Sequence, residues 1–161
     1  MQTGVCLTHL TFGDFFNQDI ENALPINLIQ LTFGYWFNQN IKTILPLNLT
    51  HLTFGYWFNK SVRDILPPNL THLTFGYCFN QNINDVLLLK NLTHLTFGNC
   101  FNQNITCVLP PNLTHLTLGR DFQRTIYCSL PDSLIELNLS NNYGFKFYLR
   151  NDKIKINYHD N

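Results

Sequence analysis

The sequence predicts a solenoid of about seven leucine-rich-like coils, mainly β, with one parallel sheet and little or no helix. A leucine recurs every 21 or 22 residues, at Leu10, Leu31, Leu52, Leu73, Leu95, Leu116 and Leu137. Polar and apolar residues alternate around each of these leucines, and a Leu-Pro pair follows most of them. A fixed period of this size is typical of repeat proteins in which each copy is one coil stacked on the last.

Each copy contains one short strand. In the third copy His51-Leu52-Thr53-Phe54 alternates with period 2, which places Leu and Phe inward and His and Thr outward, and Gly55 then marks a turn. Because one period separates successive strands, they run in the same direction and form a parallel sheet with rungs ~4.8 Å apart. We expect this sheet on the inner face of a right-handed solenoid.

The second corner of each coil carries a Phe-Asn pair. In a stack these asparagines lie on adjacent rungs, where their amides can bond backbone groups of the neighbouring coil. We therefore predict an asparagine ladder. Its members follow the phenylalanine in five copies, at Asn17, Asn38, Asn59, Asn80 and Asn102.

The return limb carries the Leu-Pro pair, as in Leu45-Pro46. Proline removes a backbone donor and disfavours helix, so an extended or polyproline-like back is expected. The fourth copy departs from this pattern, with 86–90 reading Val-Leu-Leu-Leu-Lys, one added residue and no proline. A local bulge is expected there.

The repeats fade after residue 139, which divides the chain into a solenoid, 1–139, and a C-terminal capping segment, 140–161. Two alternating segments, 145–149 and 154–158, flank the turn signal Arg-Asn-Asp-Lys and predict a charged hairpin over the last rung. The N-terminal end has no such cap. An open strand edge favours pairing with another chain, so self-association is expected there.

Composition excludes several classes of partner. Charged residues make up 12% of the chain against a usual ~25%, and the formal net charge is +0. Neither nucleic acid nor a membrane surface is therefore expected as a partner. The five cysteines have no metal-binding spacing, and no secretory signal opens the chain, so we expect a cytoplasmic protein with free thiols, Cys78 and Cys100 included.

The repeated phrase resembles a known family. Leu-Thr-Phe-Gly-x-x-Phe-Asn-Gln-x-Ile, followed by Leu-Pro-x-Asn-Leu-x-x-Leu, resembles the FNIP repeat, a leucine-rich-repeat-like unit of amoebae and of the large DNA viruses that infect them, from about Leu7 to Leu139. The resemblance implies protein binding, with host proteins as targets if the chain is viral. Members with an F-box ahead of the repeats select substrates for a ubiquitin ligase, which is the alternative function. An F-box needs roughly forty to fifty residues, and Leu7 already belongs to the first coil.

The candidate partner-binding surface consists of two outward columns. Five copies place histidine at one position and most place threonine two residues later, and the candidate residues are His51, His72, His94, His115, Thr53, Thr74, Thr96 and Thr117. Consecutive histidines one rung apart are close enough to share a divalent cation, so a metal-binding or structural module is a second alternative. Metal sites usually have stronger ligand spacing, and protein recognition is favoured.

Aromatic residues after the glycine form a further column, Tyr35, Tyr56 and Tyr77, with Trp36 and Trp57 beside it. Exposed, these side chains would anchor a partner; buried, they would fill the corner of the coil.

No arrangement of residues supports catalysis. Asp64 and Asp85 share a column, as a glycosidase pair would, but no further acid or pocket-forming motif accompanies them. We expect a recognition module that is not an enzyme and has no cofactor.

Overall fold

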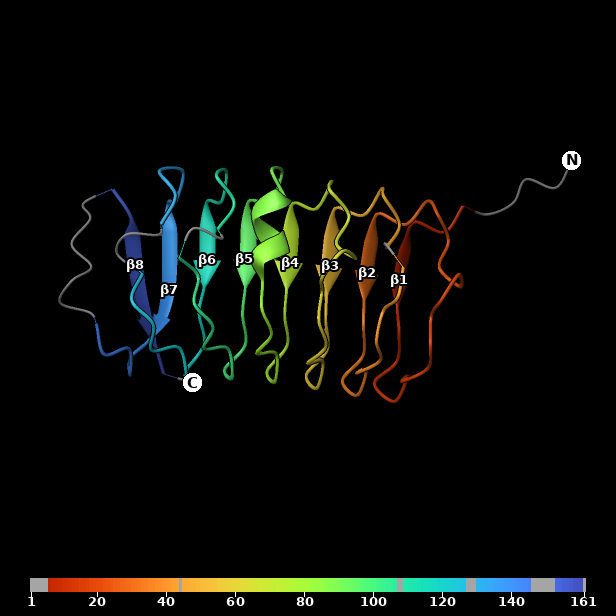
Figure 1. Ribbon diagram of the computed structural model, residues 1–161, viewed down its shortest axis with the longest axis horizontal. Helices are drawn as coiled ribbons and strands as arrows, with labels where there is room; N and C mark the ends of the chain where they lie inside the picture. The colour runs from red at the N-terminus through yellow and green to blue at the C-terminus, as the bar shows by residue number, and fades with distance from the viewer. Residues whose placement is uncertain (1–5, 44, 107–108, 127–129, 146–152, 161) are drawn as a thin grey trace, which may run out of the picture.

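The computed structural model describes residues 6–43, 45–106, 109–126, 130–145 and 153–160. Eight parallel strands form one sheet in sequence order. The strands are β1 (His9–Thr11), β2 (Gln30–Thr32), β3 (His51–Thr53), β4 (His72–Thr74), β5 (His94–Thr96), β6 (His115–Thr117), β7 (Glu136–Ser140) and β8 (Lys155–His159). They lie side by side along the long axis (Figure 1). The predicted solenoid with one parallel sheet is confirmed.

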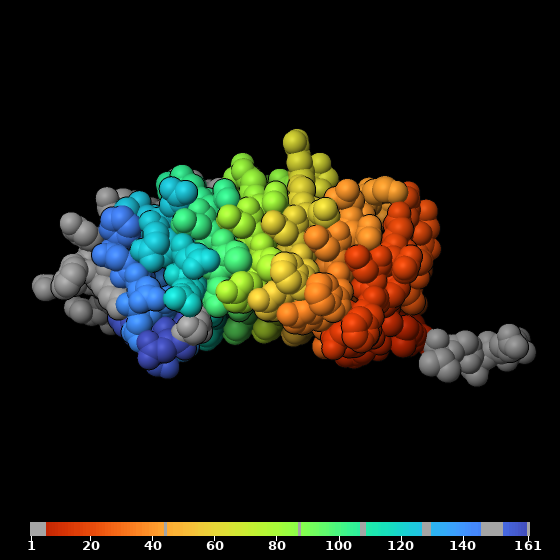
Figure 2. All heavy atoms as spheres, turned by 90° about the horizontal axis from the view of Figure 1, so that it is seen from below, coloured from red at the N-terminus to blue at the C-terminus, as the bar shows by residue number. Residues whose placement is uncertain are grey.

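Each coil contacts its sequence neighbours. The register pairs identical repeat positions, so that Leu52 of β3 lies between Leu31 and Leu73. In the space-filling view the colours follow one another along the long axis as bands (Figure 2). Equivalent positions of the repeat therefore form columns of side chains along the molecule.

Two columns of stacked phenylalanine rings fill the core. Phe54 and Phe58 of one coil lie 4.0 Å apart between ring centroids, and Phe58 stacks on Phe37 and Phe79 at 6.1 Å on either side. The leucine column of the strands packs beside them, and Leu31 and Phe58 are fully buried. Because a solenoid coil is too thin to enclose its own core, this burial is shared between neighbouring coils.

The glycine after each strand is required by close packing. A Cβ built on Gly76 would lie 2.0 Å from the carbonyl oxygen of Gly55, and the same short approach to the preceding coil recurs at Gly34, Gly55, Gly98 and Gly119. No described glycine has a positive φ. The turn assigned to this position from the sequence therefore depends on the missing side chain rather than on the special backbone freedom of glycine.

The asparagine ladder is confirmed. The Asn38 carboxamide oxygen accepts the backbone N–H of Asn59 at 3.0 Å, and Asn59 accepts that of Asn80 at 3.0 Å. The ladder runs from the first coil to the sixth. In the sixth coil the backbone N–H of Gln123 donates to the Asn102 side-chain oxygen at 3.1 Å. Backbone donors at this corner are thereby satisfied by the asparagine side chain of the preceding coil.

The return limb differs from the extended back that was expected. Prolines open hydrogen-bonded turns, in which Leu49 N–H donates to the Pro46 carbonyl at 3.1 Å and Leu28 N–H donates to that of Pro25 at 3.3 Å. In the fourth copy a 3₁₀ helix, η1 (Asn84–Leu88), takes the place of the expected bulge. A turn brings each limb back over the core in fewer residues than an extended segment, which explains the difference.

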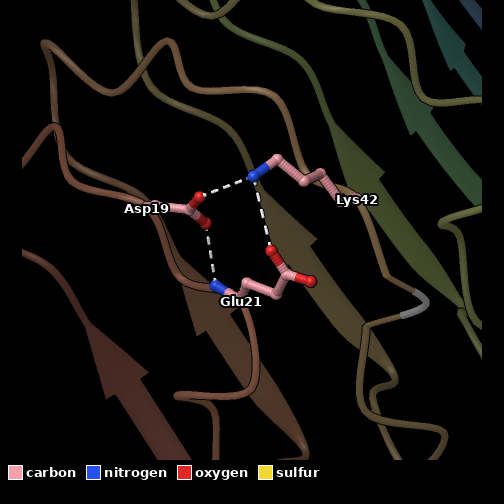
Figure 3. Close-up of polar contacts among 3 residues, drawn as sticks. All are labelled: Asp19, Glu21 and Lys42. Atoms are coloured by element: carbon pink, nitrogen blue, oxygen red, sulfur yellow. Dashed lines mark hydrogen bonds and ion pairs between the residues drawn. The ribbon is translucent and has the colours of Figure 1, made fainter.

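An ion-pair cluster joins the first two coils on this limb. Lys42 Nζ lies 3.0 Å from Asp19 and 3.3 Å from Glu21, and Asp19 also accepts the Glu21 backbone N–H (Figure 3). These hydrogen bonds lower the pKa of Asp19, and the two carboxylates raise the pKa of Lys42. Exposed pairs of this kind contribute little to stability.

Of the hairpin predicted at the C-terminal end, the structure describes the second segment, which is a strand. Residues of 154–158 belong to β8, which pairs in parallel with β7 and so adds an eighth rung to the same sheet. Most of the first segment, 145–149, lies outside the described residues. The alternation in 154–158 indicated a strand correctly, but period 2 does not determine the direction of pairing.

Candidate functional site

Two columns of side chains lie on the exposed face of the sheet. We call this surface the sheet face. The register aligns His9, Gln30, His51, His72, His94, His115, Glu136 and Lys155 in one column. The other contains Thr11, Thr32, Thr53, Thr74, Thr96, Thr117, Asn138 and Asn157. All eight predicted His and Thr residues thus lie on one surface, either exposed or half-buried.

Four imidazoles form a continuous stack on this face. Ring centroids are 4.2 Å apart from His51 to His72, from His72 to His94 and from His94 to His115, with interplanar angles of 7° to 10°. The Nδ1 atom of each ring lies 2.8 or 2.9 Å from the hydroxyl of the threonine before it. The rings are therefore held in one orientation, edge toward solvent.

The stack makes protonation unfavourable. Partial burial and then the neighbouring imidazoles lower the pKa of His72 and of His94 below the ordinary 6.5. The unfolded chain therefore takes up these protons more readily than the folded chain does. Stability from the stack is complete above about pH 6.5 and is lost as pH falls toward the lowered pKa values of the folded state.

We accordingly expect a lower melting temperature at pH 5.5 than at pH 7.5. A His72→Asn/His94→Asn variant should show a smaller difference, because it lacks the two imidazoles that resist protonation. Glu136, whose pKa is lowered chiefly by a hydrogen bond from Lys155, titrates below this window. Thermal unfolding followed by circular dichroism at both pH values tests this, and equal melting temperatures would count against a closely stacked column.

The stack has the wrong shape for a shared cation. Zinc and similar ions draw their ligands together around one centre, whereas nearly parallel rings direct their ring nitrogens side by side. Among the described residues, no group of three or more His, Cys, Asp or Glu side chains is placed to hold a metal ion.

The aromatic residues lie on the rim that follows the sheet face. Tyr35, Tyr56 and Tyr77 stack at 4.6 Å, and Trp36 stacks on Trp57 at 5.6 Å. Tyr35 is 41% exposed and Trp36 is 46% exposed. They are thus surface side chains rather than corner filler, and they stand beside the histidine and threonine columns.

The remaining candidates have structural roles. Asp85 accepts the backbone N–H of Asp64 at 2.9 Å, which supports the positive φ of 60° at Asp64. Cys78 and Cys100 continue the tryptophan column as free, half-buried thiols, and burial raises the pKa of each. A higher pKa leaves less of the reactive thiolate at neutral pH.

Sequence analysis missed the threonine that precedes each histidine. Thr71 Oγ1 contacts both His72 and the backbone carbonyl of Thr50 in the coil before, at 3.1 Å. The signal was present, because Thr-His occurs in five copies. This threonine falls outside the short strand and was therefore not assigned to either face.

No helix in the described part of the chain is long and apolar enough to cross a membrane. Stacked coils with one short parallel strand each, joined through a leucine and phenylalanine core, place the protein in the class of leucine-rich-repeat-like solenoids. Folds of this class are consistent with protein-interaction modules.

Comparison with known proteins identifies the family. The FNIP repeat model matches residues 5–36, 37–78, 62–100 and 101–142, so the chain belongs to the FNIP repeat family. A similar solved structure is CroV588 of a giant virus, described as a novel circular LRR protein, with a TM-score of 0.74 and 40% identity. The match covers 96% of this chain and only 27% of that one. No curated protein matches the chain significantly.

Proposed function

We propose that the protein is a non-catalytic recognition module that binds a partner protein through the sheet face and its tyrosine rim. The observation that carries this proposal is the continuous stack of imidazole rings from His51 to His115 on the solvent-facing side of the sheet, with the stacked tyrosines on the rim that follows it. Stacked rings have lost most of their conformational freedom before a partner arrives, which lowers the entropy cost of binding. Aromatic side chains at the rim supply the contact area typical of binding anchors.

The partner is a host cytoplasmic protein, in keeping with the giant-virus relative. The test is affinity capture from a host lysate. The wild type is compared with His51→Thr/His72→Thr/His94→Thr, which retains β-propensity but removes the imidazoles. The control Thr43→Ala/Arg63→Ala/Thr106→Ala alters three exposed residues of the return limb. Loss of specific partners in the first variant alone supports the proposal, and identical partners in all three samples contradict it. Ligase components among the retained proteins would instead favour substrate selection for ubiquitination.

The N-terminal edge offers a second contact, to another copy of the chain. In the described part of the chain β1 pairs only with β2, and open edges add strands readily. Light scattering should show a mass that rises with protein concentration, and Thr11→Pro, which removes a backbone donor at this edge, should reduce the rise. A monomer mass at every concentration would contradict this association.

A further inference from the structure

The threonine before each histidine makes two contacts at once. The hydroxyls of Thr50, Thr71, Thr93 and Thr114 lie 2.8 or 2.9 Å from Nδ1 of the next residue. The same hydroxyls lie 3.0 to 3.3 Å from a backbone carbonyl oxygen of the preceding coil. Together these contacts determine where each imidazole carries its proton.

A hydroxyl group has a single hydrogen, and a carbonyl oxygen can only accept. The Thr50 carbonyl already accepts two backbone N–H groups from the next coil, at 2.9 and 3.0 Å, and the Thr71 hydroxyl is its third donor. Without a hydrogen between them, two oxygens at 3.1 Å would repel each other. The hydroxyl hydrogen is therefore directed at the carbonyl, and the remaining Thr71 lone pairs accept a proton from His72 Nδ1. The neutral ring then has an unprotonated Nε2.

The same arrangement in four coils produces a row of Nε2 lone pairs spaced as the rings are, 4.2 Å apart. The strands carry few charges around this row. Glu136 continues the column beyond His115, and Lys155 lies 3.3 Å from Glu136 as its ion-pair partner. Gln30 and the threonine column complete the face, and Tyr56 stands on the rim. At neutral pH the row is thus an acceptor surface with the Glu136–Lys155 ion pair at one end.

We infer that this row binds a basic protein segment, whose lysine or arginine side chains donate hydrogen bonds to Nε2 of His51, His72, His94 and His115. The inference rests on the proposed function and names the chemistry of its partner. Ammonium and guanidinium groups are donors only, which matches a row of acceptors. A carboxylate has only acceptor atoms, so it could not form hydrogen bonds with the unprotonated Nε2 atoms.

Acidification reverses this preference. A protonated imidazole donates from both nitrogens, so the row becomes cationic and repels the basic segment. The hydrogen bond from Lys155 lowers the pKa of Glu136, so this carboxylate stays ionised through this range and does not cause the change. Binding should therefore be strongest above about pH 7.

The tautomer is tested first, without any ligand. Long-range ¹H–¹⁵N correlation spectra at pH 8 should show an unprotonated Nε2 and a protonated Nδ1 in His72 and His94. Thr71→Val/Thr93→Val replaces each hydroxyl by a methyl group and should move the proton to Nε2. Thr71→Ser/Thr93→Ser retains the hydroxyl and should leave the spectrum unchanged. A protonated Nε2 in the wild type would overturn the inference.

The partner chemistry is tested with capped tetralysine and capped tetraglutamate at low salt. At pH 7.5 tetralysine should shift the His72 and His94 ring resonances, and tetraglutamate should not. The valine variant should bind tetralysine roughly tenfold more weakly than the serine variant, because acceptors become donors. Binding should be lost at pH 5.0. Tetralysine that shifts neither ring, or equal affinity of both variants, would overturn the assignment.

These results separate the inference from the proposed function. If tetralysine does not bind but capture of host proteins still depends on the imidazoles, the partner is not a basic segment. The proposed recognition by the sheet face would then stand. Capture that does not depend on the imidazoles removes both.

Discussion

Replacing Gly76 by alanine is expected to lower the free energy of unfolding by ~3 kcal/mol or more. The added Cβ would lie 2.0 Å from the carbonyl oxygen of Gly55 and 2.9 Å from the Cα atom of Tyr56. Both neighbours are backbone atoms, so the coils themselves would have to move apart. Overpacking that displaces side chains typically costs about 1–3 kcal/mol, and displaced backbone belongs at the upper end or beyond. Chemical denaturation measures the change.

Gly13→Ala is the matched control, because it changes the same repeat position in the first coil. A Cβ at Gly13 would meet nothing within 4 Å, and its φ is not positive. Alanine there restricts the unfolded chain and should stabilise the protein by about 0.4–1 kcal/mol. The two glycine-to-alanine substitutions are thus expected to change the free energy of unfolding in opposite directions. Equal effects of both would show that the coils are not in close backbone contact.

Phe58→Ala should cost about 3–5 kcal/mol, the usual range for removal of a fully buried phenylalanine. The Phe58 ring has no exposed surface, and it stacks on Phe37 and Phe79. Its loss leaves a gap between three consecutive coils. Since a lone coil cannot bury its own core, the disruption should spread to both neighbours.

Phe16→Ala, in the first coil, is the comparison. Phe16 is half-buried and stacks on a neighbouring coil at Phe37 alone. Its removal should therefore lower the melting temperature far less than Phe58→Ala does. Equal losses in the two variants would contradict shared burial along the array.

The repeat made much of this structure predictable. Once Leu52 and Phe58 are known to recur at one period, stacking in register determines that equivalent repeat positions form columns. The asparagine ladder follows from this register, and the outward histidines and inward leucines follow because a sheet also alternates its side chains strictly. The exposed face was therefore visible in the sequence before its distances were known.

Features that depend on contacts between coils were less predictable. The amino-acid sequence alone does not show that Gly76 lies against Gly55. Nor does it show that the Thr71 hydroxyl lies between the His72 ring and a backbone carbonyl of the preceding coil. The parallel direction of β8 is likewise set by its pairing with β7 in the preceding coil. A sequence pattern gives the face that a residue occupies, but not the atom that it meets.

Nuclear Overhauser contacts between imidazole rings test the central claim most directly, because they exist only if the coils stack in register. With centroids 4.2 Å apart, ring protons of His72 should give cross-peaks to those of both His51 and His94. His51 and His94, two rungs apart, should show none. Absence of the neighbour contacts in a folded protein would contradict the stacked row on which recognition by this face depends.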